Sequence, residues 1–133
     1  MVILDTSVII DHLRRPAEES VLVKLYKKST DQIFGISVVS VQELYEGKST
    51  KDATKESQLL SVLGLLEVLP YNLEVAKLAG EIARDAKRPI ELADAAIAAT
   101  VILNEAELYT LNTKHFGVIP GLRMTGEDLR KGV

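Results

Sequence analysis

The chain has 133 residues, a net charge of −3 and no cysteine, which excludes disulfides, thiolate metal sites and cysteine nucleophiles. With hydrophobic residues at 47% and charged residues at 26%, we expect one globular domain with an ordinary core. No apolar run approaches the roughly 20 residues that cross a bilayer, and no signal peptide is evident, so we expect a cytoplasmic protein with no membrane contact.

The acidic balance bears on nucleic-acid binding. It argues against a protein that coats nucleic acid through bulk positive potential. It does not exclude an enzyme that holds a phosphodiester through metal ions, because those ions supply positive charge locally.

In chain order, apolar runs alternate with helical patterns. Strands are predicted over residues 2–5, 32–37, 66–70 and 107–111, with a further short strand over residues 121–124. Helices are predicted over residues 7–15, 17–28, 37–47, 51–66, 72–88 and 92–105. Strands that alternate with helices favour an α/β domain with a parallel sheet of four to five strands flanked by helices. Ligands bind such sheets at the carboxyl ends of the strands.

Asp5 ends the first apolar strand, in the stretch VILDTS. Asp is a common helix N-cap, which is the simpler explanation of this residue. Ser7 or Thr6 could cap the following helix instead, and we expect Ser7 to do so. Asp5 is then free to act at the predicted crevice.

Glu43 lies in the helix that follows the second strand. Together with Ser40 it matches the S-x-x-E capping box, which would give Glu43 a structural role. The start of this helix also faces the same crevice as Asp5, so a ligand role stays open.

Asp94 lies in the first turn of an alanine-rich helix. The helix dipole favours an acid there by a fraction of a kcal/mol to about 1 kcal/mol. The apolar surroundings would nevertheless desolvate the carboxylate, which is costly without a positive partner. Three acids at one end of a sheet repel one another unless a cation binds, and oxygen ligands suit Mg²⁺ or Mn²⁺ rather than Zn²⁺.

Four stretches in order, DTSVIIDHL, GISVVSVQELYEG, LADAAIAAT and YTLNTKHFGVIPGL, resemble the PIN-domain nucleases, and most closely the VapC-type toxins of toxin–antitoxin pairs. The resemblance covers essentially the whole chain. It implies a metal site made of Asp5, Glu43 and Asp94, with Thr6 as the hydroxyl that supports the metal shell. The fourth family position, often Asp, is Asn112 here, which can offer a neutral carbonyl oxygen.

The resemblance implies a Mg²⁺-dependent endoribonuclease, in which Mn²⁺ can substitute, with catalytic residues Asp5, Glu43, Asp94 and Asn112. Expected partners are an RNA substrate, a small antitoxin protein and a second copy of the chain in a homodimer. The apolar, lysine-bearing helix over residues 21–28 is a candidate antitoxin surface. Candidate RNA contacts are Lys48, Lys51 and Lys114, with Arg84, Lys87 and Arg88 as weaker candidates. His115 is expected at the rim of the site, at most as a substrate contact.

Two other readings have different sequence requirements. Asn112 leaves open a PIN-like module that binds RNA or protein and cuts weakly or not at all. A receiver-type phosphoacceptor needs an Asp at the end of a strand in the middle of the chain, and the strand over residues 66–70 has none.

Overall fold

A four-stranded parallel sheet forms the centre of the molecule, as the sequence predicts. The computed structural model describes residues 1–117 and 119–125, and the sheet order is β3-β2-β1-β4. The strands are β1 (Val2–Leu4), β2 (Phe34–Ser37), β3 (Glu67–Leu69) and β4 (Glu107–Tyr109). The strand expected over residues 121–124 is reduced to a single parallel bridge between Met124 and Leu108.

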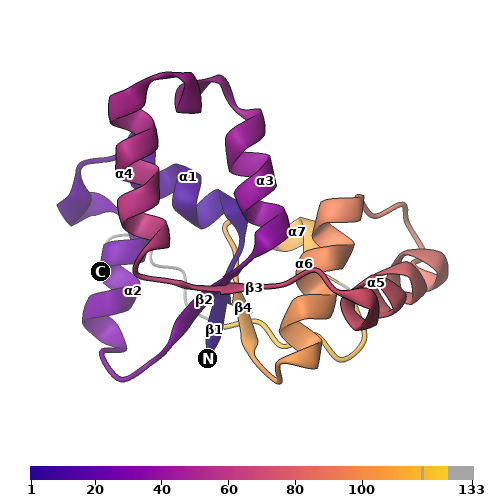
Figure 1. Ribbon diagram of the computed structural model, residues 1–133. Helices are drawn as coiled ribbons and strands as arrows, with labels where there is room; N and C mark the ends of the chain where they lie inside the picture. The colour runs from indigo at the N-terminus through magenta and orange to yellow at the C-terminus, as the bar shows by residue number, and fades with distance from the viewer. Residues whose placement is uncertain (118, 126–133) are drawn as a thin grey trace.

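Helices cover both faces of the sheet (Figure 1). They are α1 (Thr6–Arg14), α2 (Val21–Lys28), α3 (Val38–Glu46), α4 (Ala53–Leu63), α5 (Leu73–Asp85), α6 (Leu92–Leu103) and α7 (Thr113–Phe116), with 3-10 turns η1 (Ala17–Glu19) and η2 (Lys48–Lys51). None of them in the described part of the chain is long and apolar enough to span a bilayer. The α/β class predicted from the sequence is therefore confirmed.

Alternate residues of β1 point into two different cores, as the two-residue period of a strand requires. Val2 and Leu4 join the cluster formed with α1 to α4, whereas Ile3 joins the cluster formed with α6 and α7. The central strand is thus buried on both faces. Its last residue, Leu4, is followed directly by Asp5 at the carboxyl edge of the sheet.

The helix predicted over residues 17–28 is broken at Ser20, so this prediction was wrong in part. The Ser20 hydroxyl accepts a hydrogen bond from the Val23 backbone N–H, and Asp11 of α1 accepts one from the Val21 N–H. These two side chains satisfy donors at a new helix start, which separates η1 from α2. Val21, Leu22 and Leu25 of α2 are buried in the core of the chain itself.

The capping box predicted for Ser40 and Glu43 is wrong. Helix α3 follows β2 without a loop, and its N-cap is Ser37, whose hydroxyl accepts from the Val39 N–H. Ser40 lies inside the helix, where its buried Oγ has no hydrogen-bond partner. Glu43 therefore stands in the second turn of α3 and is free for another role. By contrast, Asn72 caps α5, because its side chain accepts a hydrogen bond from the Val75 N–H.

Candidate active site

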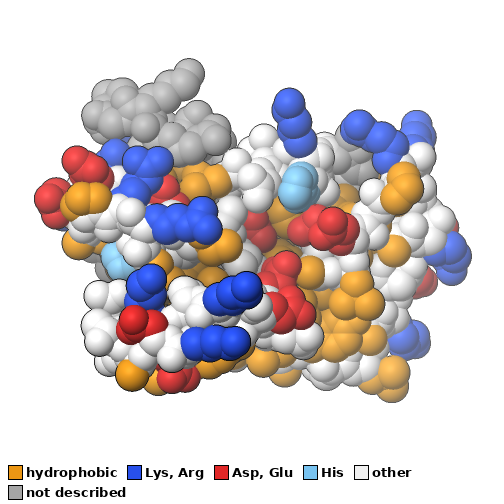
Figure 2. Space-filling view, turned by 90° about the horizontal axis from the view of Figure 1, so that it is seen from above, with side chains coloured by type: hydrophobic (Ala, Val, Ile, Leu, Met, Phe, Trp, Pro, Cys, Tyr) orange, Lys and Arg blue, Asp and Glu red, His pale blue; other side chains and the backbone are white. Residues whose placement is uncertain are grey.

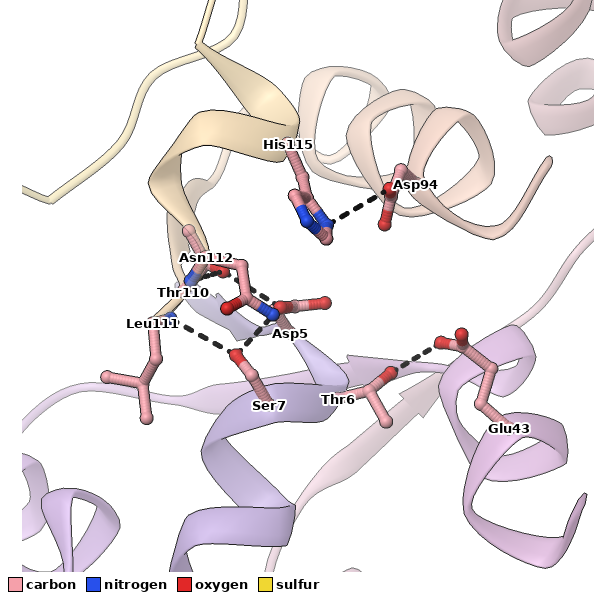
Figure 3. Close-up of polar contacts among 9 residues, drawn as sticks. All are labelled: Asp5, Thr6, Ser7, Glu43, Asp94, Thr110, Leu111, Asn112 and His115. Atoms are coloured by element: carbon pink, nitrogen blue, oxygen red, sulfur yellow. Dashed lines mark hydrogen bonds and ion pairs between the residues drawn. The ribbon is translucent and has the colours of Figure 1, made fainter. Parts of the chain in front are cut away.

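Four segments bring polar side chains to the carboxyl edge of the sheet. Asp5 follows β1, residues 110–112 follow β4, Glu43 comes from α3 and Asp94 from α6. Figure 3 shows the carboxylates of Asp5, Glu43 and Asp94 directed toward one open space, with Asn112 beside Asp5. Sequence reasoning placed all four at this edge, and the structure brings them together.

Asp5 is buried at 5% exposure and is held by two hydroxyls. Ser7 Oγ and Thr110 Oγ1 each donate a hydrogen bond of 2.8 Å to Asp5 Oδ2. Asp5 is also the N-cap of α1 by position, but its side chain accepts no capping bond from a backbone N–H of the helix. The expectation that Ser7 caps this helix is wrong, because the Ser7 hydroxyl donates to Asp5 and accepts from the Leu111 N–H.

The segment after β4 is shaped around the same carboxylate. The Asp5 N–H donates to the Tyr109 carbonyl at 2.9 Å, which continues the pairing of β1 with β4. Thr110 Oγ1 in turn accepts from the Asn112 N–H at 2.9 Å. One hydroxyl thus links Asp5 to the backbone of Asn112. The Asn112 backbone carbonyl in turn accepts a hydrogen bond from the backbone N–H of His115 in α7.

Thr6 supports Glu43 rather than its neighbour Asp5. Its hydroxyl donates to Glu43 Oε1 at 2.6 Å, across the space between α1 and α3. This short charge-assisted bond holds the Glu43 carboxylate toward Asp5. Thr6 therefore belongs to the site through Glu43, while Ser7 and Thr110 orient Asp5.

Asp94 is the acid whose ionisation the site perturbs. Burial at the start of α6, followed by the negative charge of Asp5, raises the pKa of Asp94 to about 6. Glu91 and Glu43 add to the rise in pKa, and His115 opposes it. The His115 Nδ1 atom lies 3.5 Å from Asp94 Oδ2. A raised pKa beside other acids indicates a site that lacks positive charge.

The donors in this space fit a hard divalent cation in chemistry, because they are carboxylate and amide oxygens. Within residues 1–117 and 119–125, however, no three Asp, Glu, His or Cys side chains are gathered as a ready-made metal site. Glu43 is held by Thr6, and Asp94 lies beside His115.

A family model described as the PIN domain matches residues 2–121. The chain belongs to the PIN-domain family. Ribonuclease VapC10 of Mycobacterium tuberculosis is 35% identical to this PIN domain over 127 residues, which cover 92% of the chain and 91% of VapC10. Ribonuclease VapC19 of the same organism is 30% identical over 129 residues, which cover 92% of the chain and 98% of VapC19.

Solved structures have the same architecture as this PIN domain. DNA-bound VapBC from Salmonella typhimurium superposes with a TM-score of 0.81 at 26% identity, over 93% of this chain and 96% of the other. VapBC2 from Rickettsia felis, bound to a promoter DNA fragment, gives 0.82 at 26% identity, over 96% and 100%.

Cationic side chains surround the acids of this PIN domain at some distance. Figure 2 shows acidic side chains near the middle of one face, with Lys and Arg side chains on either side. Lys114 of α7 lines one groove together with Asp94. Lys48 and Lys51 lie on η2, beyond the C-terminal end of α3, and do not line that groove.

Sequence reasoning missed Thr110 and the hydrogen bonds that Ser7 makes with Asp5 and Leu111. It also missed Glu91, whose charge adds to the rise in the pKa of Asp94. The signal for Thr110 was its position after a strand that lies parallel beside β1, which puts its hydroxyl level with Asp5. His115 was expected at the rim, and it is exposed there while it contacts Asp94.

Proposed function

We propose that this protein is a divalent-metal-dependent endoribonuclease, the toxin of a VapBC-type toxin–antitoxin pair. The observation that carries the proposal is the group of three carboxylates from the residue after β1, from α3 and from α6, in which burial and the charge of Asp5 raise the pKa of Asp94 to about 6. The named activity of the VapC relatives supports ribonuclease chemistry at this site.

Asp5, Glu43 and Asp94 would hold Mg²⁺, or Mn²⁺ in its place, and the Asn112 amide would add a neutral oxygen. When bound, the ion supplies charge that stabilises the attacking and leaving oxygens of a phosphodiester. Asn112 in place of an acid lowers the negative charge of the site by one, which favours weaker cation binding than four carboxylates would give.

The residues of the chain pre-orient these ligands. Ser7 and Thr110 fix the Asp5 carboxylate, and Thr6 fixes Glu43. Such supporting bonds keep ligand oxygens aimed at the ion and at the reacting phosphate. Lys114 lies in the groove beside Asp94, where its ammonium can contact an RNA phosphate, and Lys48 and Lys51 are further candidates along η2.

Cleavage of a mixed-sequence, single-stranded RNA with Mg²⁺ or Mn²⁺ tests the proposal. We expect the wild-type chain to cut, and both Asp5→Asn and Asp94→Asn to reduce the rate by at least about 100-fold. Glu74→Gln, an exposed acid in the first turn of α5, serves as the matched control and should cut normally. Activity that survives both site substitutions, or that persists in excess EDTA, would overturn the proposal.

A module that binds RNA or protein without cutting is the alternative. Asn112 favours it, as does the lack of a gathered metal site among the described residues. Calorimetric titration of the folded, partner-free chain with Mn²⁺ separates the two readings. No measurable Mn²⁺ binding would favour the module, and binding that Asp5→Asn abolishes would favour the nuclease.

The proposed partners are a small antitoxin and a second copy of the chain, and the proposed location is the cytoplasm, where RNA is translated. The VapBC neighbours are toxin–antitoxin proteins, which supports the first partner. The apolar side of α2 is occupied by the core, so a smaller hollow between α1 and α4, of about 450 Å³, is the better antitoxin surface. Exposed Leu65 lines this hollow, and Leu65→Asp should weaken co-purification with the antitoxin partner.

A further inference from the structure

A groove leads away from Asp94 along the end of α5. It has a volume of about 980 Å³ and lies between the C-terminal part of α5, the connection to α6, and α7. Asp94 and His115 line one end, so the groove opens directly into the candidate active site. Whatever occupies it lies beside the reacting phosphate.

The floor of the groove is apolar. Ile82 and Ile90 are half-buried there, and exposed Pro89 stands beside them. Ile82 and Ile90 pack against the core formed by α5 and α6, which fixes their position. A rigid apolar floor with polar groups at its margin suits a flat, partly apolar group such as a nucleobase.

The rim of the groove carries three exposed cations, Lys87, Arg88 and Lys114. None of the three has an ion pair in the part of the chain that the structure describes. Arg84, the fourth cation, is neutralised by Asp85 through two hydrogen bonds of 2.8 and 2.9 Å.

The acids that line the groove are Glu81, Asp85, Glu91 and Asp94. Glu91 and Asp94 lie at the end nearest the active site, and Asp85 is paired with Arg84. Glu81 is the remaining acid of the lining. The rim therefore offers attraction to phosphate at Lys87 and Arg88, and Lys114 adds positive charge beside Asp94.

We propose that this groove is a nucleotide subsite, which binds one unpaired RNA nucleotide next to the scissile phosphate. The base lies on Ile82, Pro89 and Ile90, and the flanking phosphates contact Lys87, Arg88 and Lys114. The base is unpaired in this proposal because an unstacked base of single-stranded RNA can place its face on a protein surface, whereas a base in a duplex stays stacked. The inference rests on the proposed function, since it assumes an RNA chain that passes Asp94.

Binding measured in EDTA tests the subsite apart from catalysis. The probe is a fluorescein-labelled, mixed-sequence, single-stranded RNA of about 12 nucleotides, titrated with the full chain by fluorescence anisotropy. We expect the double variant Lys87→Glu/Arg88→Glu to lower affinity by about 10-fold or more. Lys77→Glu, an exposed lysine of α5 outside the groove, is the matched control and should change affinity less than about 2-fold.

A second arm tests the base. Oligonucleotides that contain one abasic residue, moved through each position, should show one position at which the wild type loses about 5-fold or more in affinity. Ile90→Gln should reduce that loss, while Leu103→Gln, a partly exposed residue at the far end of α6, should not. Circular dichroism of each variant reports whether the fold is intact.

The outcomes separate the two proposals. If RNA is cut normally and the groove variants bind like wild type, the subsite is wrong and the nuclease stands. If no metal-dependent cleavage occurs but the groove variants lose RNA affinity, the subsite stands and the nuclease is wrong. If the charge-reversed variant keeps RNA affinity but loses self-association or antitoxin binding, the groove holds a protein and the subsite is overturned.

Discussion

At the scale of single residues, Thr110 connects Asp5 with the backbone of Asn112. Its hydroxyl donates to Asp5 and accepts from the Asn112 N–H, so one oxygen fixes both a carboxylate and the start of α7. A threonine next to a strand is commonly explained by its β-strand propensity. Here the hydroxyl matters because it donates one hydrogen bond and accepts another. Second-layer hydroxyls of this kind tune the ligand that they hold.

Thr110→Val keeps the shape of the side chain and removes the hydroxyl. We expect cleavage to fall about 10- to 100-fold, because Asp5 loses one of its two orienting donors. Unfolding in urea should show a loss of about 1–3 kcal/mol from the buried carboxylate left under-bonded. Thr113→Val, an exposed neighbour, is the control, and full activity of Thr110→Val would contradict the role.

The raised pKa of Asp94 predicts a pH-dependent response to cations. Protons and Mn²⁺ compete for this carboxylate. Because its pKa is about 6, the carboxylate loses its proton as pH rises through that value and becomes available to Mn²⁺. We expect calorimetric Mn²⁺ affinity to increase between about pH 5 and about pH 7 and then to level off. Asp94→Asn should flatten this dependence.

The same group predicts the sign of a stability change without metal. Because the folded-state pKa of Asp94 lies above the ordinary value of 3.8, the folded chain binds more protons than the unfolded chain between these two pH values. The contribution of Asp94 to the free energy of unfolding therefore falls as pH rises from about 4 to about 6. Equal slopes in wild type and Asp94→Asn over this window would contradict the assignment.

At the scale of elements, the start of α3 shows how a strand-to-helix junction delivers Glu43. Helix α3 begins one residue after β2 ends in Ser37, so the helix cannot rotate freely relative to the sheet. The N-cap position determines where α3 begins, and therefore which of its residues face the site. With Ser37 as N-cap, Glu43 points toward Thr6.

Two serine substitutions test this assignment of the cap. Ser37→Ala removes the acceptor for the Val39 N–H and should lower the free energy of unfolding by about 0.5–2 kcal/mol. Ser40→Ala removes a buried hydroxyl that has no partner, so it should change stability by less than about 0.5 kcal/mol or increase it. Chemical denaturation compares the two, and the reverse order of effects would restore the capping box.

Much of the fold follows from local pattern, whereas the pairing of side chains does not. The order of the four strands and of the helices between them was predictable because burial period and cap chemistry act within a few residues, although three strands end one or two residues earlier than predicted. Ser37 and Ser40 both match a cap in sequence, and only the length of β2 decides between them. The bonds from Thr6 to Glu43 and from Thr110 to Asp5 span 37 and 105 residues, so no local pattern contains them.

At the scale of the whole molecule, apolar side chains remain exposed around one edge of the sheet. They come from the start of α3, from β3, from the connection between β3 and α5, and from the first turns of α5 and α6: Val38 at 40%, Val68 at 46%, Tyr71 at 39%, Leu73 at 77% and Leu92 at 73%. Figure 1 shows β3 and α5 next to each other along this side. Exposed apolar side chains from neighbouring elements are typical of an interface between proteins.

We expect this edge to form the homodimer interface. The double variant Leu73→Asp/Leu92→Asp should convert a dimer to a monomer, measured by light scattering after size-exclusion chromatography. Leu60→Asp is the control, because Leu60 is 53% exposed on α4, outside this group of elements. A wild-type chain that is monomeric at tens of micromolar would contradict the expectation.

The pairing of β1 with β4 also sets when the site can exist during synthesis. Asp5 is synthesised more than a hundred residues before its neighbours Tyr109 and Thr110. Until then the first strand lacks its partner on one side, and the carboxylate lacks the hydroxyl that aims it. A nascent chain that stops before β4 therefore carries the three acids without the framework that orients Asp5. The oriented Asp5 carboxylate can therefore form only after β4 and Thr110 have been synthesised.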